Sequence, residues 1–209
     1  MYSHSKDVVF SGVPLSDAKK AIIMLHGRGA SAESIISLKD HLKLDDAAIV
    51  APQATNSSWY PYSFMAPDQD NQPALNSALH VIDDVVKDIA AQGIELNQIY
   101  FLGFSQGACL ALEYTARHAE GYGGIIAFTG GLIGQTLDTL NYTGDFKGTP
   151  ILITTGDPDP HVPVSRVEES VEILKTLNAK VELKVYKGRM HTIQMEEIEL
   201  ANGYLERET

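Results

Sequence analysis

Two hydrophobic patterns alternate along the chain. Short continuous apolar runs rich in Val, Ile and Phe indicate strands buried on both faces, and longer stretches with apolar residues three or four positions apart indicate amphipathic helices. The predicted strands cover residues 21–27, 47–53, 98–105, 124–130, 150–156 and 181–187, the last nearer an edge. This alternation predicts an α/β fold with a mostly parallel central sheet and helices on both faces.

Helices should fill the connections between these strands. The clearest begins near Pro73, which suits a first helical turn, and ends at Gly93, which suits a left-handed stop. Further helices are predicted at residues 31–42, 106–118, 167–177 and 192–205. Residues 54–72 show neither the hydrophobic period of a helix nor that of a strand, and they include several aromatic residues. We therefore expect a long aromatic loop there. No repeat or linker divides the chain, which predicts one domain over residues 1–209, without a large cap.

Charge and composition narrow the function classes. The chain has 16 Lys and Arg against 27 Asp and Glu, a net charge of −11, which opposes binding to nucleic acid or anionic lipid. The only cysteine, Cys109, cannot form an intramolecular disulfide. The first residues lack the apolar run of a secretory signal, and no stretch is long enough to span a bilayer. We therefore expect a cytoplasmic protein with no stable membrane association.

Residues 103–107 read Gly-Phe-Ser-Gln-Gly, a G-x-S-x-G motif between a predicted strand and a predicted helix. In a nucleophile elbow, the serine lies on a strained turn that exposes its hydroxyl, and the glycines avoid Cβ clashes with neighbouring backbone. Ser105 is therefore the candidate nucleophile. The alternative is a tight glycine-rich turn with an uninvolved serine. Cys109, one helical turn further on an apolar face, is interpreted as a core thiol.

A serine nucleophile needs a histidine base and a carboxylate that orients it, in the chain order Ser, Asp, His. Of seven histidines, His191 lies in a short loop late in the chain, whereas His161 lies too close to the candidate acids. The acid should follow the end of a strand, as both Asp157 and Asp159 do. We favour Asp159, which two prolines restrict, because Asp157 could simply cap the turn.

The negatively charged oxygen of a tetrahedral intermediate needs backbone N–H donors. The N–H of Gln106, next to the nucleophile and first in a helix, is one candidate, and the N–H of Arg28, in an early strand-to-helix loop, is the other. The zinc motifs H-E-x-x-H and paired C-x-x-C, the dinucleotide motif G-x-G-x-x-G and the Walker A motif are absent from the sequence. No metal and no cofactor is therefore expected.

Together these motifs resemble the phospholipase/carboxylesterase family of α/β-hydrolases, which includes acyl-protein thioesterases and small bacterial carboxylesterases. The resemblance runs through LHGRGAS, APQATNSSWYPYSF, GFSQGA, GDPDPHVP and GRMH. It implies an α/β-hydrolase fold, a triad of Ser105, Asp159 and His191, and oxyanion-hole amides from Arg28 and Gln106. The family signature G-x-x-D-x-x-V-P implies Asp159 as the acid. Arg28 and the WYPYSF segment are similar to the bacterial carboxylesterase branch.

Five side chains are candidates for the substrate site: Trp59, Tyr60 and Phe64 of the aromatic loop, and Leu132 and Met190. The alternative for the aromatic residues is that they only anchor their loop to the core. We expect a serine carboxylesterase that hydrolyses small soluble carboxylic esters through an acyl-enzyme. A thioesterase or lysophospholipase for longer acyl chains, or a non-catalytic binding protein on a hydrolase scaffold, are the alternatives. A homodimer is compatible with the sequence.

Overall fold

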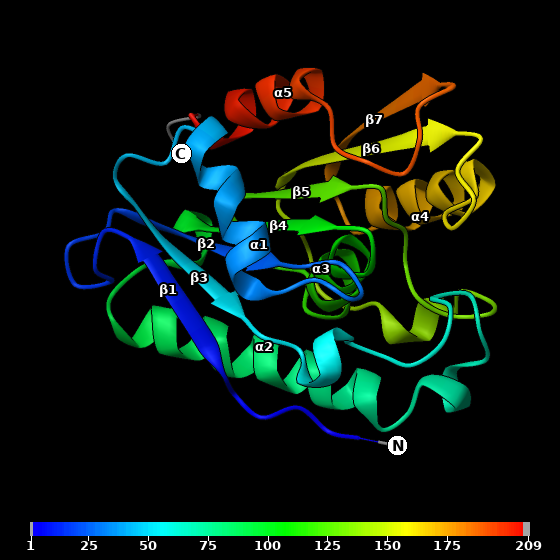
Figure 1. The fold of residues 1–209 in the computed structure, drawn as a ribbon, viewed down its shortest axis with the longest axis horizontal. Coiled ribbons are helices and arrows are strands. Elements are labelled where there is room, and N and C mark those ends of the chain that lie inside the picture. Colours follow the sequence, from blue (N-terminus) through cyan, green and yellow to red (C-terminus); the bar gives the residue numbers. More distant parts are fainter. Residues whose placement is uncertain (1, 207–209) are drawn as a thin grey trace.

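The computed structural model describes residues 2–206, and residues 1 and 207–209 of the predicted domain lie outside this part of the chain. One seven-stranded sheet runs through it, in the order β1-β3-β2-β4-β5-β6-β7 (Figure 1). The strands are β1 (Val8–Gly12), β2 (Lys20–Leu25), β3 (Ala47–Pro52), β4 (Ile99–Phe104), β5 (Gly124–Phe128), β6 (Pro150–Asp157) and β7 (Lys180–Lys187). Only β1 pairs antiparallel, so the predicted fold class is confirmed.

Five α-helices in the described residues cover both faces of this sheet. They are α1 (Ala32–Ile36), α2 (Ala74–Ala91), α3 (Gln106–Arg117), α4 (Val164–Thr176) and α5 (Met195–Leu205). Apolar side chains of α2, α3 and α4 pack in one core cluster, and those of α1 and α5 pack in a second cluster on the opposite face. Short 3-10 helices lie at Ser37–His41, Thr55–Ser57, Asp68–Asn71, Leu96–Gln98 and Thr139–Asn141.

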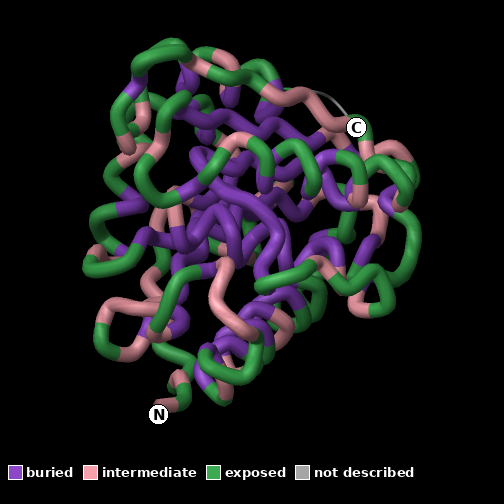
Figure 2. The backbone as a smooth tube through the Cα atoms, turned by 90° about the vertical axis from the view of Figure 1, so that its right-hand side faces the viewer, coloured by how far each residue is buried: buried purple, intermediate pink, exposed green. Residues whose placement is uncertain are grey.

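The continuous apolar runs follow from this arrangement. Successive side chains of a strand point to opposite faces, and here both faces are covered by helices. In β2, Ile23 and Leu25 lie in the first core cluster, while Ile22 and Met24 lie in the second. Figure 2 accordingly shows buried backbone through the centre of the molecule and exposed segments around it.

Four elements differ from the sequence-based expectation, and the first is α4, which begins at Val164 rather than at residue 167. The edge strand β1 was not expected, because three of its five residues are half-buried, two are exposed, and they carry no clear pattern. Helix α1 begins after Ser31 as predicted, but it changes to a 3-10 helix at Ser37. Helix α5 begins at Met195 rather than at residue 192, because Gln194 and Glu197 form a capping box that fixes its start.

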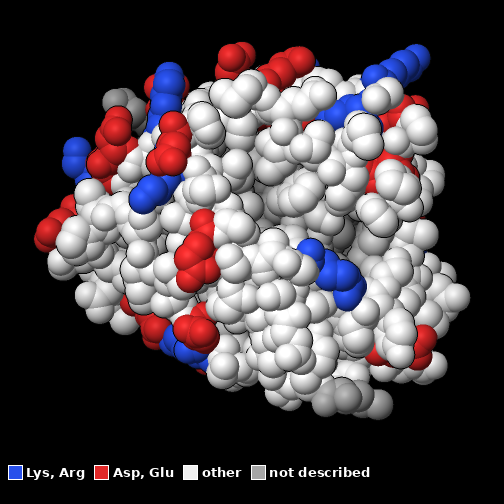
Figure 3. Space-filling model, in the orientation of Figure 1, with Lys and Arg blue, Asp and Glu red and all other residues white. Residues whose placement is uncertain are grey.

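The surface and the helices add two observations. On the face shown in Figure 3, acidic and basic side chains are interspersed, and the basic ones form no extended patch. Among the described residues, none of the helices combines the length and apolar character needed to cross a membrane.

Candidate active site

Ser105 lies on the sharp turn between β4 and α3. Its φ of 54° and ψ of −117° are unusual for a residue other than glycine, and its N–H donates to the carbonyl of Phe128, 2.9 Å away. The flanking glycines are required by close packing, because a Cβ at Gly103 would overlap the backbone of Gly107 and a Cβ at Gly107 would overlap the carbonyl of Leu25. The turn therefore has the geometry that the G-x-S-x-G motif predicts.

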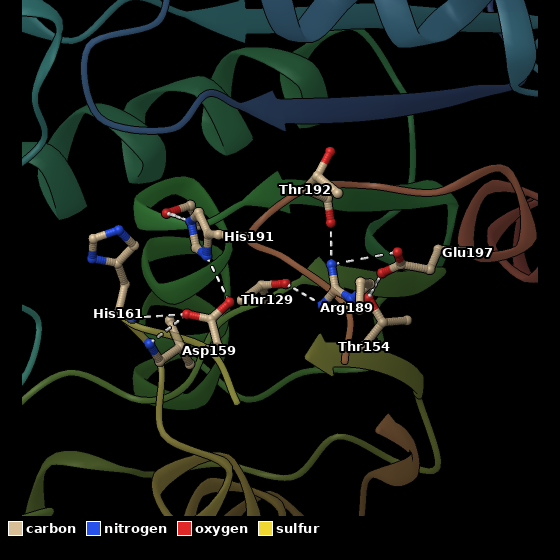
Figure 4. Close-up of polar contacts among 10 residues, drawn as sticks. Thr129, Thr154, Asp159, His161, Arg189, His191, Thr192 and Glu197 are labelled. Atoms are coloured by element: carbon tan, nitrogen blue, oxygen red, sulfur yellow. Dashed lines mark hydrogen bonds and ion pairs between the residues drawn. The ribbon is translucent and has the colours of Figure 1, made fainter. Parts of the chain in front are cut away.

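The structure brings Ser105, His191 and Asp159 into one hydrogen-bonded chain. His191 Nε2 lies 2.8 Å from Ser105 Oγ. On the other side of the ring, His191 Nδ1 lies 2.8 Å from Asp159 Oδ2 (Figure 4). Asp157 instead ends β6 with an exposed side chain, and its carbonyl accepts from the N–H of Gly188 at 2.7 Å. Of the two candidate acids, Asp159 is the one beside the histidine.

The charge state of Asp159 determines which ring nitrogen of His191 donates and which one accepts. Burial alone would raise the pKa of Asp159, but hydrogen bonds from His191 and from the N–H groups of His161 and Val162 outweigh it and hold that pKa below its usual value of 3.8. An ionised carboxylate can only accept hydrogen bonds, so Nδ1 of His191 carries the ring proton. The lone pair of Nε2 then faces the Ser105 hydroxyl, as a general base requires.

Arg28 and Gln106, whose backbone N–H groups are the candidate oxyanion donors, line the same cavity as Ser105. Gln106 is the first residue of α3, where an N–H has no acceptor within its own helix. Arg28 lies in the loop between β2 and α1. Within the described residues, no hydrogen bond is found for either N–H. Both groups are thus available to a negatively charged oxygen, and the dipole of α3 adds to the attraction.

A cavity of about 750 Å³ opens over these groups. Its walls include Ser105, His191, Tyr60, Phe64, Cys109 and Val162. Burial raises the pKa of the Cys109 thiol to about 12, so this side chain forms part of the wall as a protonated thiol. A larger hollow of about 990 Å³ lies at the opposite edge of the sheet and contains none of the candidate residues.

Three of the five predicted wall residues need correction. Trp59 is fully buried and its indole N–H donates to the carbonyl of His26 at 2.9 Å, so it anchors the loop as the alternative interpretation expected. Leu132 is also fully buried, and Met190 is 79% exposed. None of the three lines the cavity, whereas Tyr60 and Phe64 do. Their positions in the sequence placed them near the site but could not show where the side chains point.

The side chains of Arg28 and Gln106 have a second task that the sequence did not reveal. The acceptors for the Arg28 guanidinium are Ser58 Oγ, Pro61 O and Tyr62 O, at 2.9, 2.8 and 2.5 Å. The Gln106 carboxamide accepts from the N–H of Trp59 and donates to the carbonyl of Tyr60, both at 2.8 Å. The two residues with the candidate oxyanion amides thus also hold the aromatic loop against the cavity.

His161 was also missed as part of the site. It lines the cavity, and its ring packs edge-on against the His191 ring, with centroids 4.9 Å apart. As expected, it does not take the place of the base. The one signal for His161 in the sequence was its position two residues after Asp159. At that spacing its backbone N–H donates to the Asp159 carboxylate at 2.8 Å, which keeps the residue at the site.

Comparisons with known proteins identify the family of the chain. The crystal structure of a phospholipase/carboxylesterase from Dyadobacter fermentans superposes with a TM-score of 0.98 at 65% identity, covering 99% of both chains. Acyl-protein thioesterase 1 of Saccharomyces cerevisiae is 29% identical over 227 residues, covering 92% of this chain and 94% of the yeast protein. A probable carboxylesterase SOBER1-like of Arabidopsis thaliana is 28% identical over 211 residues, covering 92% of this chain and 80% of the plant protein. The family model described as phospholipase/carboxylesterase matches residues 12–208, and the chain therefore belongs to the phospholipase/carboxylesterase family of hydrolases.

Proposed function

We propose that the protein is a serine carboxylesterase that hydrolyses small soluble carboxylic esters through an acyl-enzyme. The observation that carries this proposal is the hydrogen-bonded chain from Asp159 through His191 to Ser105, with both distances at 2.8 Å, opening into a cavity. A nucleophile, a base within hydrogen-bond reach and a group that orients the base are the parts that acyl transfer requires.

The first half of the reaction forms the acyl-enzyme. Ser105 Oγ attacks the ester carbonyl carbon while its proton moves to His191 Nε2, and the Asp159 carboxylate stabilises the imidazolium that results. The N–H groups of Arg28 and Gln106 donate to the oxyanion of the tetrahedral intermediate. When the intermediate collapses, the carbon–oxygen bond to the alcohol breaks and His191 returns its proton to the leaving alcohol.

The second half regenerates the serine. A water molecule enters the place of the alcohol, gives a proton to His191 Nε2 and attacks the acyl carbon. Collapse of the second intermediate breaks the bond to Ser105 Oγ, which regains the proton from His191, and the carboxylic acid leaves. Every step uses side chains and backbone groups of the chain itself.

The preference for small esters rests on the cavity and the charge. A cavity of about 750 Å³ with aromatic walls is of the size that accommodates small-molecule ligands. The net charge of −11 disfavours docking on anionic bilayers or nucleic acid, so a soluble ester is the favoured partner. A cytoplasmic location and a homodimer stay predictions.

Hydrolysis of acyl thioesters is the second candidate. Its support is the likeness to the yeast protein named acyl-protein thioesterase 1, at 29% identity over most of both chains. The same attack by Ser105 would expel a thiol in place of an alcohol. The two functions therefore differ in the acyl chain that the cavity accepts and in the leaving group, and they use the same proposed catalytic residues.

A chain-length series distinguishes these candidates. We expect kcat/KM for p-nitrophenyl esters to be highest for short acyl chains, because the cavity is of small-molecule size and has aromatic walls. We also expect it to exceed kcat/KM for the matching thioesters. A maximum at long acyl thioesters would favour the second candidate. If the protein binds the esters but shows no hydrolysis that depends on Ser105, it is a binding protein instead.

A further inference from the structure

A buried polar cluster that the proposed mechanism does not use lies beside the catalytic loop. It joins Arg189 and Glu197 with the hydroxyls of Thr129 and Thr154 (Figure 4). The side chains of Arg189 and Glu197 are 1% and 0% exposed, and they form an ion pair with Nη1 of Arg189 3.4 Å from Oε2 of Glu197. Burial of two charges requires an explanation, because desolvation offsets most of their attraction.

The guanidinium of Arg189 closes the loop that carries His191. It donates to the carbonyl of Thr192, on the far side of His191 in the sequence, and to Thr129 Oγ1 at 2.7 Å. Residues 189 and 192 flank the base on both sides, so this one side chain links the two ends of the short segment that holds it. A rigid guanidinium fork suits such a double contact better than a flexible ammonium group.

Glu197 connects the same loop to the sheet and to α5. One carboxylate oxygen accepts from the hydroxyl of Thr154 on β6, and the other accepts from the N–H of Gln194 at 2.9 Å. The backbone adds two constraints. The N–H of Gly188 donates to the carbonyl of Asp157 at 2.7 Å, and a Cβ at Gly156 would overlap the carbonyl of Arg189. The loop is thus fixed against the end of β6, the strand that leads to Asp159.

Two details separate this cluster from an ordinary stabilising contact. Within the described residues, Arg189 Nε has no hydrogen-bond partner although it is buried, so the cluster is not optimised for stability alone. Thr129, which accepts from Arg189, has a φ of 59°, a strained value for a β-branched residue. Backbone strain that surrounding contacts maintain is concentrated at functional sites.

We propose that the Arg189–Glu197 ion pair is a positioning device that holds His191 in line between Asp159 and Ser105. Neither residue touches the reacting atoms, and both act through the loop of residues 188–192. The inference rests on the proposed function, in which His191 is the base. Misplacement of a reacting group by about 1 Å can cost about a hundredfold in rate, so a small movement of this loop would suffice.

The test uses Glu197→Gln, which keeps the shape and removes the charge. We expect kcat for a short p-nitrophenyl ester, per active site titrated with a fluorophosphonate, to fall between about tenfold and about a hundredfold, with KM little changed. The matched control is Glu113→Gln on α3, because Glu113 is also fully buried and paired with an arginine, Arg117, at 2.7 Å. It should lower the melting temperature but leave kcat unchanged.

Arg189 provides the conservative comparison. Arg189→Lys keeps the charge and one donor, so its kcat should lie between that of the wild type and that of Arg189→Met. Equal kcat values for Glu197→Gln and Glu113→Gln, measured where circular dichroism shows both folded, would overturn the proposal. If Glu197→Gln does not fold, the kcat of Thr129→Val is compared with that of Glu113→Gln instead, because this variant removes only the acceptor for Arg189. Equal kcat values would again overturn the proposal.

Failure of the inference and failure of the proposed function give different results. If only the positioning role is wrong, the wild type still hydrolyses the ester, Ser105→Ala does not, and Glu197→Gln behaves like its control. If the proposed function is wrong, the wild type itself shows no ester hydrolysis that depends on Ser105.

Discussion

At the scale of single residues, hydrogen bonds decide which ring nitrogen of His4 and of His26 carries the proton. His26 is fully buried, donates from Nδ1 to the carbonyl of Gly27 at 2.8 Å and accepts at Nε2 from the N–H of Ala54 at 3.1 Å. His4 accepts at Nδ1 from the N–H of Thr55 at 3.0 Å. A doubly protonated ring could not accept either bond, so both histidines are neutral in the folded protein.

These neutral histidines predict a loss of stability in mild acid. Burial lowers the pKa of His4 and of His26 below 6.5, whereas the unfolded chain binds these protons at the usual value. Well above pH 6.5, both rings are neutral in the folded and the unfolded protein, so neither should make the free energy of unfolding depend on pH. Below pH 6.5, stability should fall by at most about 1.4 kcal/mol per pH unit for each histidine, until the folded protein is protonated too.

Urea unfolding at a series of pH values measures this effect. The variant His4→Gln, which keeps a donor and an acceptor but does not titrate, should show a smaller slope than the wild type over the same range. A free energy of unfolding that stays constant below pH 6.5, or an equal slope in the two proteins, would contradict the assignment.

At the scale of secondary-structure elements, the approach of α3 to the end of β2 is the tightest constraint on the site. A Cβ at Gly107 would overlap the carbonyl of Leu25, which is backbone and cannot move aside. Gly203, on the exposed side of α5, has nothing within 4 Å of such a Cβ. The two glycines therefore have opposite roles, since the first allows close packing and the second only weakens a helix.

Alanine at these positions should shift stability in opposite directions. Gly107→Ala should destabilise the protein by several kcal/mol or prevent folding, because α3 would have to move away from β2. Gly203→Ala should stabilise it by about 0.5–1 kcal/mol through helix propensity. Melting temperatures of the two variants provide the measurement, and equal shifts would show that the close approach of α3 is not a constraint.

How well the sequence predicts an element depends on where the information for that element lies. Strands β2 to β6 were located within about two residues because strands buried on both faces have continuous apolar runs. The edge strand β7 has no buried residue and was located from its alternation of apolar and polar residues. The start of α5 was missed because it depends on a capping box and on the loop that Arg189 closes. Strand β1 exists through its pairing with β3, which no local pattern shows.

At the scale of the whole molecule, the meeting of the three candidate triad residues could be predicted from the sequence, but the contacts that support them could not. Ser105, Asp159 and His191 follow strand ends in a fixed order, so parallel topology alone brings them to one edge of the sheet. The cavity walls and the pair of Arg189 and Glu197 depend on side-chain directions set by tertiary packing. The sequence contains no periodic signal for such contacts, which explains why Leu132 and Met190 were misplaced.

The rate at which a fluorophosphonate probe labels the protein tests the central claim most directly. We expect a single labelled peptide that contains Ser105 and no labelling of Ser105→Ala. We also expect labelling to be slowed by orders of magnitude in Asp159→Asn and to be unchanged in the matched control Asp157→Asn. Undiminished labelling of a folded Ser105→Ala variant, or a greater loss in Asp157→Asn than in Asp159→Asn, would contradict the central claim.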